Sequence, residues 1–384
     1  MSQKVTFPED FWWGAAMSGP QMEGTFEKPH ENVMDYWYKT SKEEFFNGVG
    51  PTVATDFFHH YKEDIKMMKS IGMNSFRTSI QWSRLIKDLE TGEPDENAVK
   101  FYQDVIDECK KNDIILVLNL HHFDLPIELF QKYGGWESKH VVDLYAKFAK
   151  TAFELFGDQV RYWTTFNEPM VIPEAGYLCG FHYPKYVNKG KEAMQVIYNL
   201  NLASAKAIAL CHEICDAKIG NILNLTPAYP ATDSKEDQET SKIVDAFYNR
   251  SFLEPAVHGV FPQEMIDIMK ENDVLWDQNE EELEIIKNNT IDFLGVNYYH
   301  PKRVKTRTTP LDCDYWSPEQ YYEEYDMPGK RVNPYRGWEI YPKAIYDIAK
   351  NVQENYNNIP WFISENGMGV EGEERYINEE GKIE

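Results

Sequence analysis

The chain has 384 residues, and its 39 basic and 63 acidic side chains give a net charge of −24 with histidine neutral. Hydrophobic residues make up 42% of the sequence and aromatic residues 14%, which is enough to bury a large core and excludes overall disorder. The acidic balance and the lack of a basic stripe argue against nucleic-acid binding.

The sequence carries no signal for a membrane or for export. It has no run of about 18 apolar residues that would span a bilayer. Residues 1–13 lack the long apolar stretch of a secretory signal. The five cysteines form no C-x-x-C pair, and we expect Cys211 and Cys215, four apart in an apolar helical stretch, to serve packing. We therefore expect a cytoplasmic protein with reduced thiols and no membrane partner.

Seven short apolar segments recur along the chain, and each ends in polar residues. In chain order they are residues 11–18, 75–82, 114–122, 162–168, 218–225, 291–299 and 361–365. The stretches between them show helical periodicity, as after Ser138, where apolar residues share one face until Gly157. This alternation predicts an α/β fold with a parallel sheet covered on both faces, and we expect a TIM (β/α)₈ barrel with seven of its eight strand units present.

Polar residues gather at or near the carboxyl ends of these predicted strands. They are Gln21, Arg77, His122, Asn167, Glu168, Asn297, Tyr299 and Glu365. In a (β/α)₈ barrel this end of the strands carries the active site. An open doubly wound sheet also binds ligands at strand ends. However, no G-x-G-x-x-G turn follows the first strand and no G-x-x-x-x-G-K-[ST] occurs, so nucleotide chemistry has no support.

Two of these residues are glutamates that end an apolar strand just before a chain breaker. Glu168 stands in Thr-Phe-Asn-Glu-Pro, and Glu365 stands in Ile-Ser-Glu-Asn-Gly. They end the fourth and seventh segments, so in an eight-stranded barrel they face each other across the mouth. Two carboxylates across a sugar-sized gap are the machinery of glycoside hydrolysis. Structural salt bridges are the alternative interpretation of strand-end carboxylates.

The neighbours of the two glutamates suit a division of roles. Arg77 beside Glu365 would keep it ionised, and Tyr299 can donate a hydrogen bond to it. Glu168 has no basic neighbour in sequence, so we expect its pKa to be raised. Asn167 can bind a sugar hydroxyl. Aromatic residues near the strand ends are expected to stack on sugar rings, namely Trp82, Trp136, Trp163 and Tyr177.

The two His-His pairs raise the question of a metal. They are His59–His60 and His121–His122. Adjacent residues point apart in a strand, and no third ligand stands at metal spacing, so we expect no metal site.

The sequence resembles glycoside hydrolase family 1, the β-glucosidase and 6-phospho-β-glucosidase family, over about residues 6–369. The matching motifs, in family order, are Phe-Trp-Trp-Gly-Ala-Ala at 11–16, Phe-Arg-Thr-Ser-Ile-Gln-Trp-Ser-Arg at 76–84, Asn-Leu-His-His-Phe-Asp-Leu-Pro at 119–126, Gly-Gly-Trp at 134–136, Thr-Phe-Asn-Glu-Pro at 165–169, Gly-Val-Asn-Tyr-Tyr at 295–299, Gly-Trp-Glu-Ile-Tyr-Pro at 337–342 and Ile-Ser-Glu-Asn-Gly at 363–367.

The resemblance implies a retaining mechanism without a metal or organic cofactor. It implies that Glu168 is the acid/base, Glu365 is the nucleophile, and their carboxyl groups lie ~5–5.5 Å apart. It further implies a sugar-binding set, which is Gln21, His122, Asn167, Asn297 and Tyr299. Arg77 and Tyr299 match residues that support the nucleophile.

The resemblance also points to a subgroup. Met-Ser-Gly-Pro-Gln at 17–21 is similar to bacterial 6-phospho-β-glucosidases, so the expected partner is a small-molecule β-glycoside, most simply a phosphorylated disaccharide. A β-glucosidase and a 6-phospho-β-galactosidase are the alternatives, and a non-catalytic sugar binder or inactive fragment is the alternative of another class. An anionic substrate needs a local basic pocket despite the charge of −24. In the family that pocket is a Ser/Lys/Tyr set in the loop after the eighth strand.

The sequence after Gly367 bears on domain organisation. Residues 368–384 are rich in glutamate and show no strand pattern, whereas a strand–helix unit needs ~30 residues. We therefore expect residues 1–384 to form a single catalytic domain that is incomplete at its C-terminus. The sequence leaves the oligomeric state open.

Overall fold

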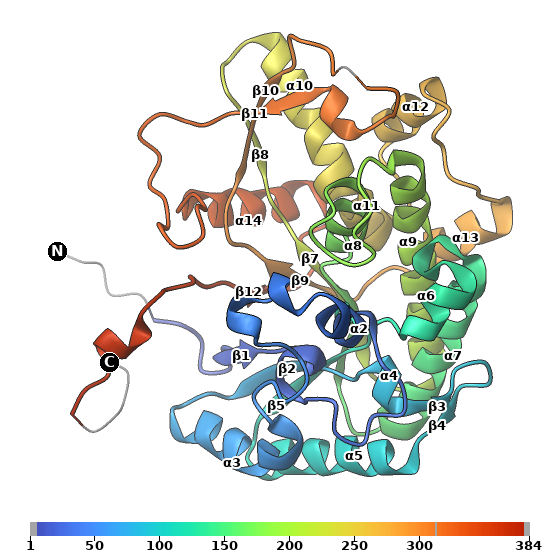
Figure 1. Cartoon of the computed structure of the whole chain (residues 1–384), viewed down its shortest axis with the longest axis vertical. Coiled ribbons are helices and arrows are strands. Elements are labelled where there is room, and N and C mark those ends of the chain that lie inside the picture. The colour runs from blue at the N-terminus through green and yellow to red at the C-terminus, as the bar shows by residue number, and fades with distance from the viewer. Residues whose placement is uncertain (1–5, 312, 380–384) are drawn as a thin grey trace.

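A parallel sheet of seven strands forms the centre of the computed structural model, which describes residues 6–311 and 313–379 (Figure 1). The strands neighbour one another in chain order, as in a β/α barrel. They are β1 (Gly14–Ala16), β2 (Ser75–Ser79), β5 (Ile115–Asn119), β6 (Tyr162–Asn167), β7 (Lys218–Asn224), β9 (Phe293–Asn297) and β12 (Trp361–Glu365). Each lies within one of the seven predicted segments, so the strand prediction is confirmed.

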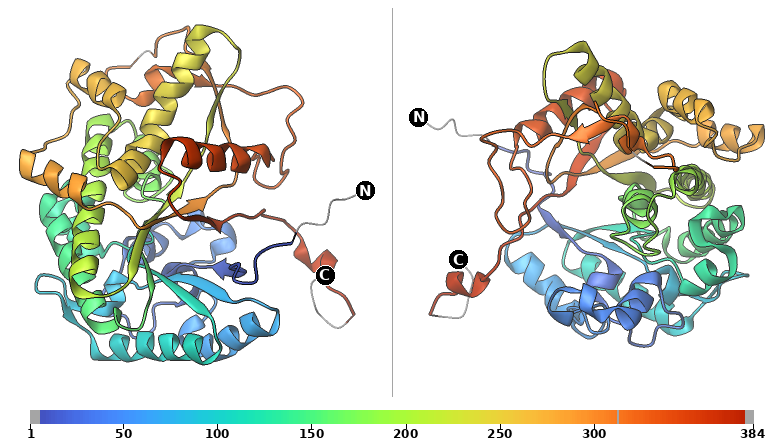
Figure 2. Two further views of the ribbon diagram at one scale, coloured as in Figure 1. Left: turned by 180° about the vertical axis from the view of Figure 1, so that it is seen from behind. Right: turned by 45° about the horizontal axis from the view of Figure 1, so that its top comes forward.

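Helices join successive strands and cover the outside of the sheet, as Figures 1 and 2 show. The longer ones are α3 (Phe57–Ser70), α5 (Glu96–Lys111), α7 (Lys139–Phe156), α9 (Gly190–Ile214), α10 (Lys235–Asp245), α11 (Ser251–His258), α12 (Gln263–Glu271), α13 (Glu280–Asn288) and α14 (Lys343–Asn355). Further helices are α1 (Gly19–Met22), α2 (Val33–Thr40), α4 (Trp82–Leu85), α6 (Ile127–Tyr133) and α8 (Val171–Pro173). Within the described part of the chain, no helix is both long and apolar enough to cross a membrane.

Helix α7 shows why the sequence folds in this way. Its apolar stripe, including Val141, Tyr145 and Phe148, is fully buried against the sheet and α9. Burying such a stripe is the main source of helix stability in a domain. Ser138 occupies the N-cap position as predicted, although its hydroxyl makes no capping hydrogen bond.

A small second sheet rises from the carboxyl ends of β7 and β9, at the top of Figure 1. Its strands are β8 (Ala228–Pro230), β10 (Lys302–Thr306) and β11 (Tyr322–Glu324), with β10 in the middle. β10 is parallel to β8 and antiparallel to β11. A hairpin-like pair, β3 (Ile86–Asp88) and β4 (Glu93–Pro94), follows β2. These insertions account for the long spacings between the predicted strands.

The first and last strands of the central sheet flank a large cavity. Among the described residues, no hydrogen-bonded ladder joins β1 to β12. The cavity has a volume of about 1140 Å³ and is lined by both strands, together with Gln21, Arg77 and Tyr299. Past β12, the described residues 366–379 contain one short helical turn, Glu373–Tyr376, and no strand. The cavity therefore connects the barrel interior with the carboxyl ends of the strands.

Candidate active site

The backbone is irregular at both predicted catalytic glutamates. The β6–β7 register shifts between Thr164 and Asn167, and the β12–β9 register shifts between Ile363 and Glu365. Such bulges re-aim side chains beside active sites. Glu168 has a φ of 48°, a left-handed conformation that typically costs about 1–3 kcal/mol outside glycine. Its N–H donates to the carbonyl of Ile222 at 2.8 Å, so β7 holds this conformation in place.

The carboxylate of Glu365 is held by a cation and a hydroxyl. Arg77, only 3% exposed, forms an ion pair with Oε1 through Nη2. The hydroxyl of Tyr299 donates to Oε2 at 2.6 Å. Burial, followed by the hydrogen bond to Glu365 and then by the charge of Glu365, raises the pKa of Tyr299, so the phenol keeps its proton and remains a donor. Both contacts stabilise negative charge on Glu365, as a nucleophilic carboxylate requires.

Glu168 lies in the opposite electrostatic environment. Burial raises the pKa of its carboxyl group to about 7, and the negative charge of Glu365 adds to that shift. A hydrogen bond from Asn297 Nδ2 to Oε1, at 2.8 Å, and the charge of Arg77 oppose it. Desolvation is the largest of these effects, so a large fraction of Glu168 carries a proton near neutral pH. The raised pKa that we predicted is thus present.

Hydrogen bonds join these groups into one network across the strand ends. Arg77 Nη1 donates to Asn167 Oδ1 at 3.0 Å and lies 3.3 Å from His122 Nδ1. Asn167 Nδ2 lies 3.0 Å from His122 Nε2. Asn297 donates to Asn167 Oδ1 at 3.1 Å as well as to Glu168. Burial, with Arg77 nearby, holds the pKa of His122 well below its usual value, so this imidazole is neutral. Seven of the eight predicted site residues therefore belong to one contiguous cluster.

Gln21 stands apart from that cluster but lines the same cavity as Arg77 and Glu365. It is exposed, and its Oε1 accepts hydrogen bonds from the backbone and hydroxyl of Ser18 in a capping box that starts α1. This capping fixes the first turn of the helix and therefore the position of Gln21.

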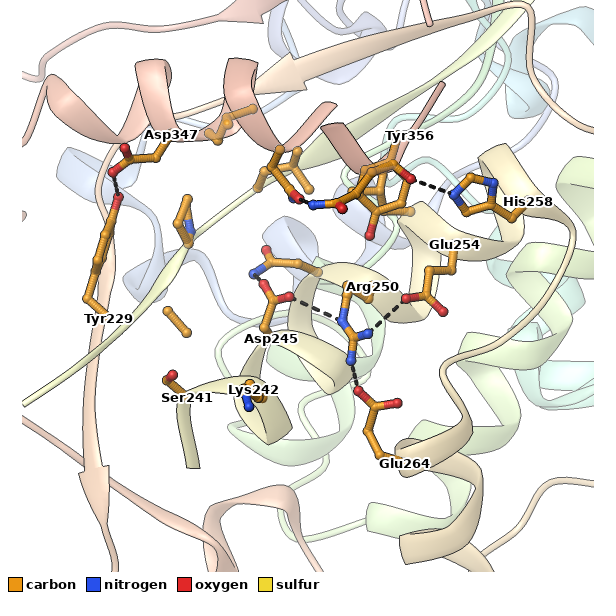
Figure 3. Close-up of a pocket in the computed structure, with 18 residues that line it drawn as sticks. Tyr229, Ser241, Lys242, Asp245, Arg250, Glu254, His258, Glu264, Asp347 and Tyr356 are labelled. Atoms are coloured by element: carbon orange, nitrogen blue, oxygen red, sulfur yellow. Dashed lines mark hydrogen bonds and ion pairs between the residues drawn. The ribbon is translucent and has the colours of Figure 1, made fainter. Parts of the chain in front are cut away.

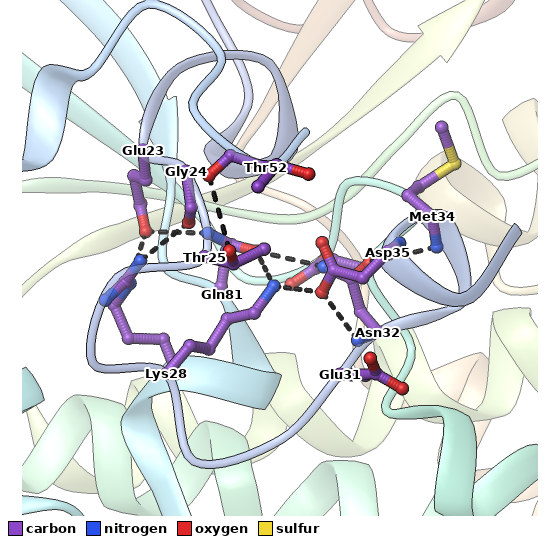
Figure 4. A network of polar contacts seen from close by, with 12 residues as sticks. Glu23, Gly24, Thr25, Lys28, Glu31, Asn32, Met34, Asp35, Thr52 and Gln81 are labelled. Atoms are coloured by element: carbon purple, nitrogen blue, oxygen red, sulfur yellow. Dashed lines mark hydrogen bonds and ion pairs between the residues drawn. The ribbon is translucent and has the colours of Figure 1, made fainter. Parts of the chain in front are cut away.

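A buried polar network anchors the segment that carries Gln21 (Figure 4). Glu23 accepts hydrogen bonds from Arg84 Nε and Gln81 Nε2, each at 2.7 Å. Lys28 and Asp35 form an ion pair whose side chains are only 3% and 4% exposed. Buried charges are tolerated when they are paired and hydrogen-bonded in this way. The network ties residues 18–35 to the carboxyl end of β2, next to Arg77.

A second cavity, of about 620 Å³, lies between α11 and α14 (Figure 3). Its carboxylates surround Arg250, which contacts Asp245 at 3.2 Å, Glu254 at 2.9 Å, and Glu264. Because these three carboxylates share one guanidinium, the cavity presents a structural ion-pair cluster. The strand-end cluster instead places Glu365, which is paired with Arg77, in one network with Glu168, whose carboxyl pKa is raised by burial, so we place the active site there. In the described part of the chain, no group of three or more His, Cys, Asp or Glu side chains is arranged to hold a metal.

The sequence profile of glycosyl hydrolase family 1 matches residues 3–384. The chain belongs to this family. It is therefore a glycoside hydrolase, and its seven-stranded parallel sheet is that of the family's TIM barrel.

Individual relatives agree with the family assignment. The chain is 50% identical to 6-phospho-beta-glucosidase GmuD of Bacillus subtilis, covering 100% of this chain and 83% of that one. It is 35% identical to a 6-phospho-beta-galactosidase of Clostridium acetobutylicum, covering 98% of this chain and 81% of the relative. The family 1 β-glucosidase structure from Thermotoga maritima superposes with a TM-score of 0.87 at 30% identity, covering 98% of this chain and 81% of that chain.

One prediction for this family 1 hydrolase is wrong. The four aromatic residues expected to stack on sugar rings are all buried, with exposed fractions of 0–3% for Trp82, Trp136, Trp163 and Tyr177. They pack in the core, as in the stacked rings of Trp82 and Phe148, because strand-end position does not decide which way a large side chain points.

An aromatic ring next to Tyr299 is one that we did not predict. Trp338 is partly exposed, and its ring lies 5.4 Å from the ring of Tyr299. It stands in the Gly-Trp-Glu-Ile-Tyr-Pro motif. Its place in that motif is the only feature of the sequence that indicates a role for Trp338 in the site.

The hydroxyl of Tyr299 offers a test of the site. Tyr299→Phe removes a hydrogen bond to a charged carboxylate, which is worth about 1.5–3 kcal/mol, so we expect kcat to fall about 10- to 100-fold. Steady-state kinetics with a nitrophenyl β-glycoside will measure the loss. Tyr298→Phe is the matched control, because the Tyr298 hydroxyl donates to the carbonyl of Tyr341 and not to Glu365. Equal losses in both variants would contradict the role of Tyr299.

Proposed function

We propose that the chain hydrolyses β-glycosidic bonds with retention of anomeric configuration. Glu365 attacks the anomeric carbon while Glu168 gives its proton to the leaving oxygen. Glu168 then removes a proton from water, which attacks the glycosyl–enzyme ester and releases Glu365. The observation that carries this proposal is the opposite environment of the two carboxyl groups within one network, since one is paired with Arg77 and the other is desolvated.

The other residues of the cluster receive supporting roles in the proposal. The sugar-binding set comprises Gln21, His122, Asn167, Asn297 and Tyr299. Arg77 and Tyr299 position Glu365 and hold its charge. On this proposal, we expect the two carboxyl groups to lie ~5–5.5 Å apart, the separation of retaining enzymes. We further propose that residues 1–384 act as one catalytic domain and that the enzyme works in the cytoplasm.

We propose 6-phospho-β-glucosides as the substrates. The support is the identity of 50% over the whole chain to a 6-phospho-β-glucosidase, against 35% to a 6-phospho-β-galactosidase. Plain β-glucosides are the second candidate, favoured by the TM-score of 0.87 to a β-glucosidase and by the net charge of −24, which disfavours an anionic substrate.

Kinetics on matched substrates tests this choice. We expect kcat/KM for 4-nitrophenyl β-glucoside 6-phosphate to exceed that for the plain glucoside by at least ~10-fold, because charge-assisted hydrogen bonds to a phosphate contribute about 1.5–3 kcal/mol. The galactoside 6-phosphate serves as the epimer control. A plain glucoside that is cleaved as fast or faster would refute the phosphorylated substrate. A cooperatively folded chain that cleaves none of the three but binds one would instead support the non-catalytic sugar binder.

A further inference from the structure

Two thiols lie in contact at the carboxyl end of α9, and neither belongs to the catalytic cluster. The Sγ atoms of Cys211 and Cys215 are 3.7 Å apart, and neither cysteine is in a disulfide. Cys215 is the C-cap residue and has extended backbone angles, with a φ of −137° and a ψ of 153°. Its N–H still donates to the carbonyl of Cys211 at 3.0 Å. The two side chains thus occupy the i and i+4 positions of a last helical turn, where neighbours meet.

The two thiols differ in their access to solvent. Cys211 is completely buried in the core, whereas Cys215 is partly exposed at the helix end. Cys215 packs against Gly157 at the end of α7, where an added Cβ would lie 2.7 Å from the Cβ of Cys215. A small molecule can therefore reach Cys215 directly, but it can affect Cys211 only through Cys215. An accessible thiol beside a resolving thiol is the arrangement found at reversible oxidation sites.

We propose that Cys211 and Cys215 form a modification site for low-molecular-weight disulfides such as glutathione disulfide. The thiolate of Cys215 attacks one sulfur of glutathione disulfide, which forms a mixed disulfide and releases one glutathione thiolate. The thiolate of Cys211 then attacks Sγ of Cys215, which closes the protein disulfide and releases the second glutathione. In total, two protein thiols are oxidised, one glutathione disulfide is reduced, and the two thiol protons end on two glutathione molecules.

The local structure allows this closure at a modest displacement. A disulfide requires Cβ atoms about 3.5–4.5 Å apart, whereas i and i+4 residues of a helix have Cβ atoms about 5–6 Å apart. The side chain that must move belongs to Cys215, whose backbone has already left the helix. Burial raises the pKa of both thiols. At Cys215 the hydrogen bond with Cys211 opposes this rise, and the charges of Asp158 and Asp216 add to it. The reaction is therefore slow at neutral pH, which suits a response to sustained oxidation.

Peptide mapping of the folded chain tests the proposal directly. Residues 207–218 lie between two trypsin sites, after Lys206 and after Lys218, and contain no other cysteine. After treatment with glutathione disulfide and alkylation in denaturant, we expect this peptide to carry no alkyl group and to be about 2 Da lighter than the dithiol form. Reduced glutathione in excess should restore two alkylatable thiols.

Two variants separate the steps. Cys211→Ser should stop at a glutathione adduct on Cys215, and Cys215→Ser should leave Cys211 unmodified because it is buried. The proposal is overturned if the wild-type peptide keeps two free thiols, or if it retains a glutathione adduct as stably as the Cys211→Ser variant does. It is also overturned if Cys211 in the Cys215→Ser variant reacts as fast as Cys215 in its counterpart.

Discussion

Glu365→Gln is expected to lower kcat on a β-glucoside 6-phosphate by at least ~10⁴-fold, the scale seen when a covalent nucleophile is removed. The amide keeps the shape of the side chain and its contact with Tyr299, but it has no negative charge with which to attack the anomeric carbon or to pair with Arg77. Release of nitrophenol, measured under saturating substrate, reports kcat directly. KM should change little, because the substitution leaves the sugar-binding side chains in place.

The result needs a fold control and a chemical control. Glu371→Gln changes an exposed glutamate six residues further along and should keep full activity. Glu365→Gly in the presence of azide should form an α-glycosyl azide, since azide takes the place of the missing carboxylate on the same face of the sugar. More than a tenth of wild-type turnover in a correctly folded Glu365→Gln variant would exclude Glu365 as the nucleophile.

The strand framework could be predicted from the sequence because burial leaves a direct record in it. Strands covered on both faces read as short apolar runs, and each run ended where the chain reached the mouth of the barrel. The positions of Glu168 and Glu365 followed from the same pattern, because a charged residue that ends an apolar run marks the point where the strand leaves the core. Arg77 lies in β2 opposite Ala16, the last residue of β1, and its guanidinium reaches Glu365 at the end of β12.

The directions of side chains could not be predicted in this way. Trp82 follows the carboxyl end of β2 and Trp163 lies near the amino end of β6, and the rings of both turn into the core. The bulges at Asn167 and Glu365 decide which side chains face the cavity, and they depend on pairing between strands far apart in sequence. The same holds for Trp338, which reaches Tyr299 from a long connection with no periodic pattern. Side-chain direction is a property of tertiary packing, so it appears only in the folded structure.

The pKa of Glu168 leads to the last prediction, which concerns the pH dependence of activity. A catalytic acid works only in its protonated form, so activity should fall as pH rises through about 7, the pKa that burial imposes on Glu168. Glu168→Gln removes the titrating group, and the alkaline limb of the kcat/KM profile should disappear with it. For glycosides with poor leaving groups the variant should also lose about 10²- to 10⁴-fold in kcat/KM, the usual contribution of general acid catalysis.

The leaving group supplies the internal control for that experiment. A dinitrophenyl glycoside needs little protonation to depart, so its kcat/KM should depend far less on Glu168 than that of a disaccharide. If both substrates lost activity equally, the residue would be acting through the fold and not as an acid. If the alkaline limb persisted in Glu168→Gln, another group would be responsible for it.

The Asn297 side chain offers a second test of the same carboxyl group. Because Asn297 donates to Glu168 and opposes the rise of its pKa, Asn297→Ala should move the alkaline limb of the pH profile to higher pH. A shift in that direction would tie the titrating group to this one carboxyl, because Asn297 makes its 2.8 Å hydrogen bond to Glu168 and not to Glu365.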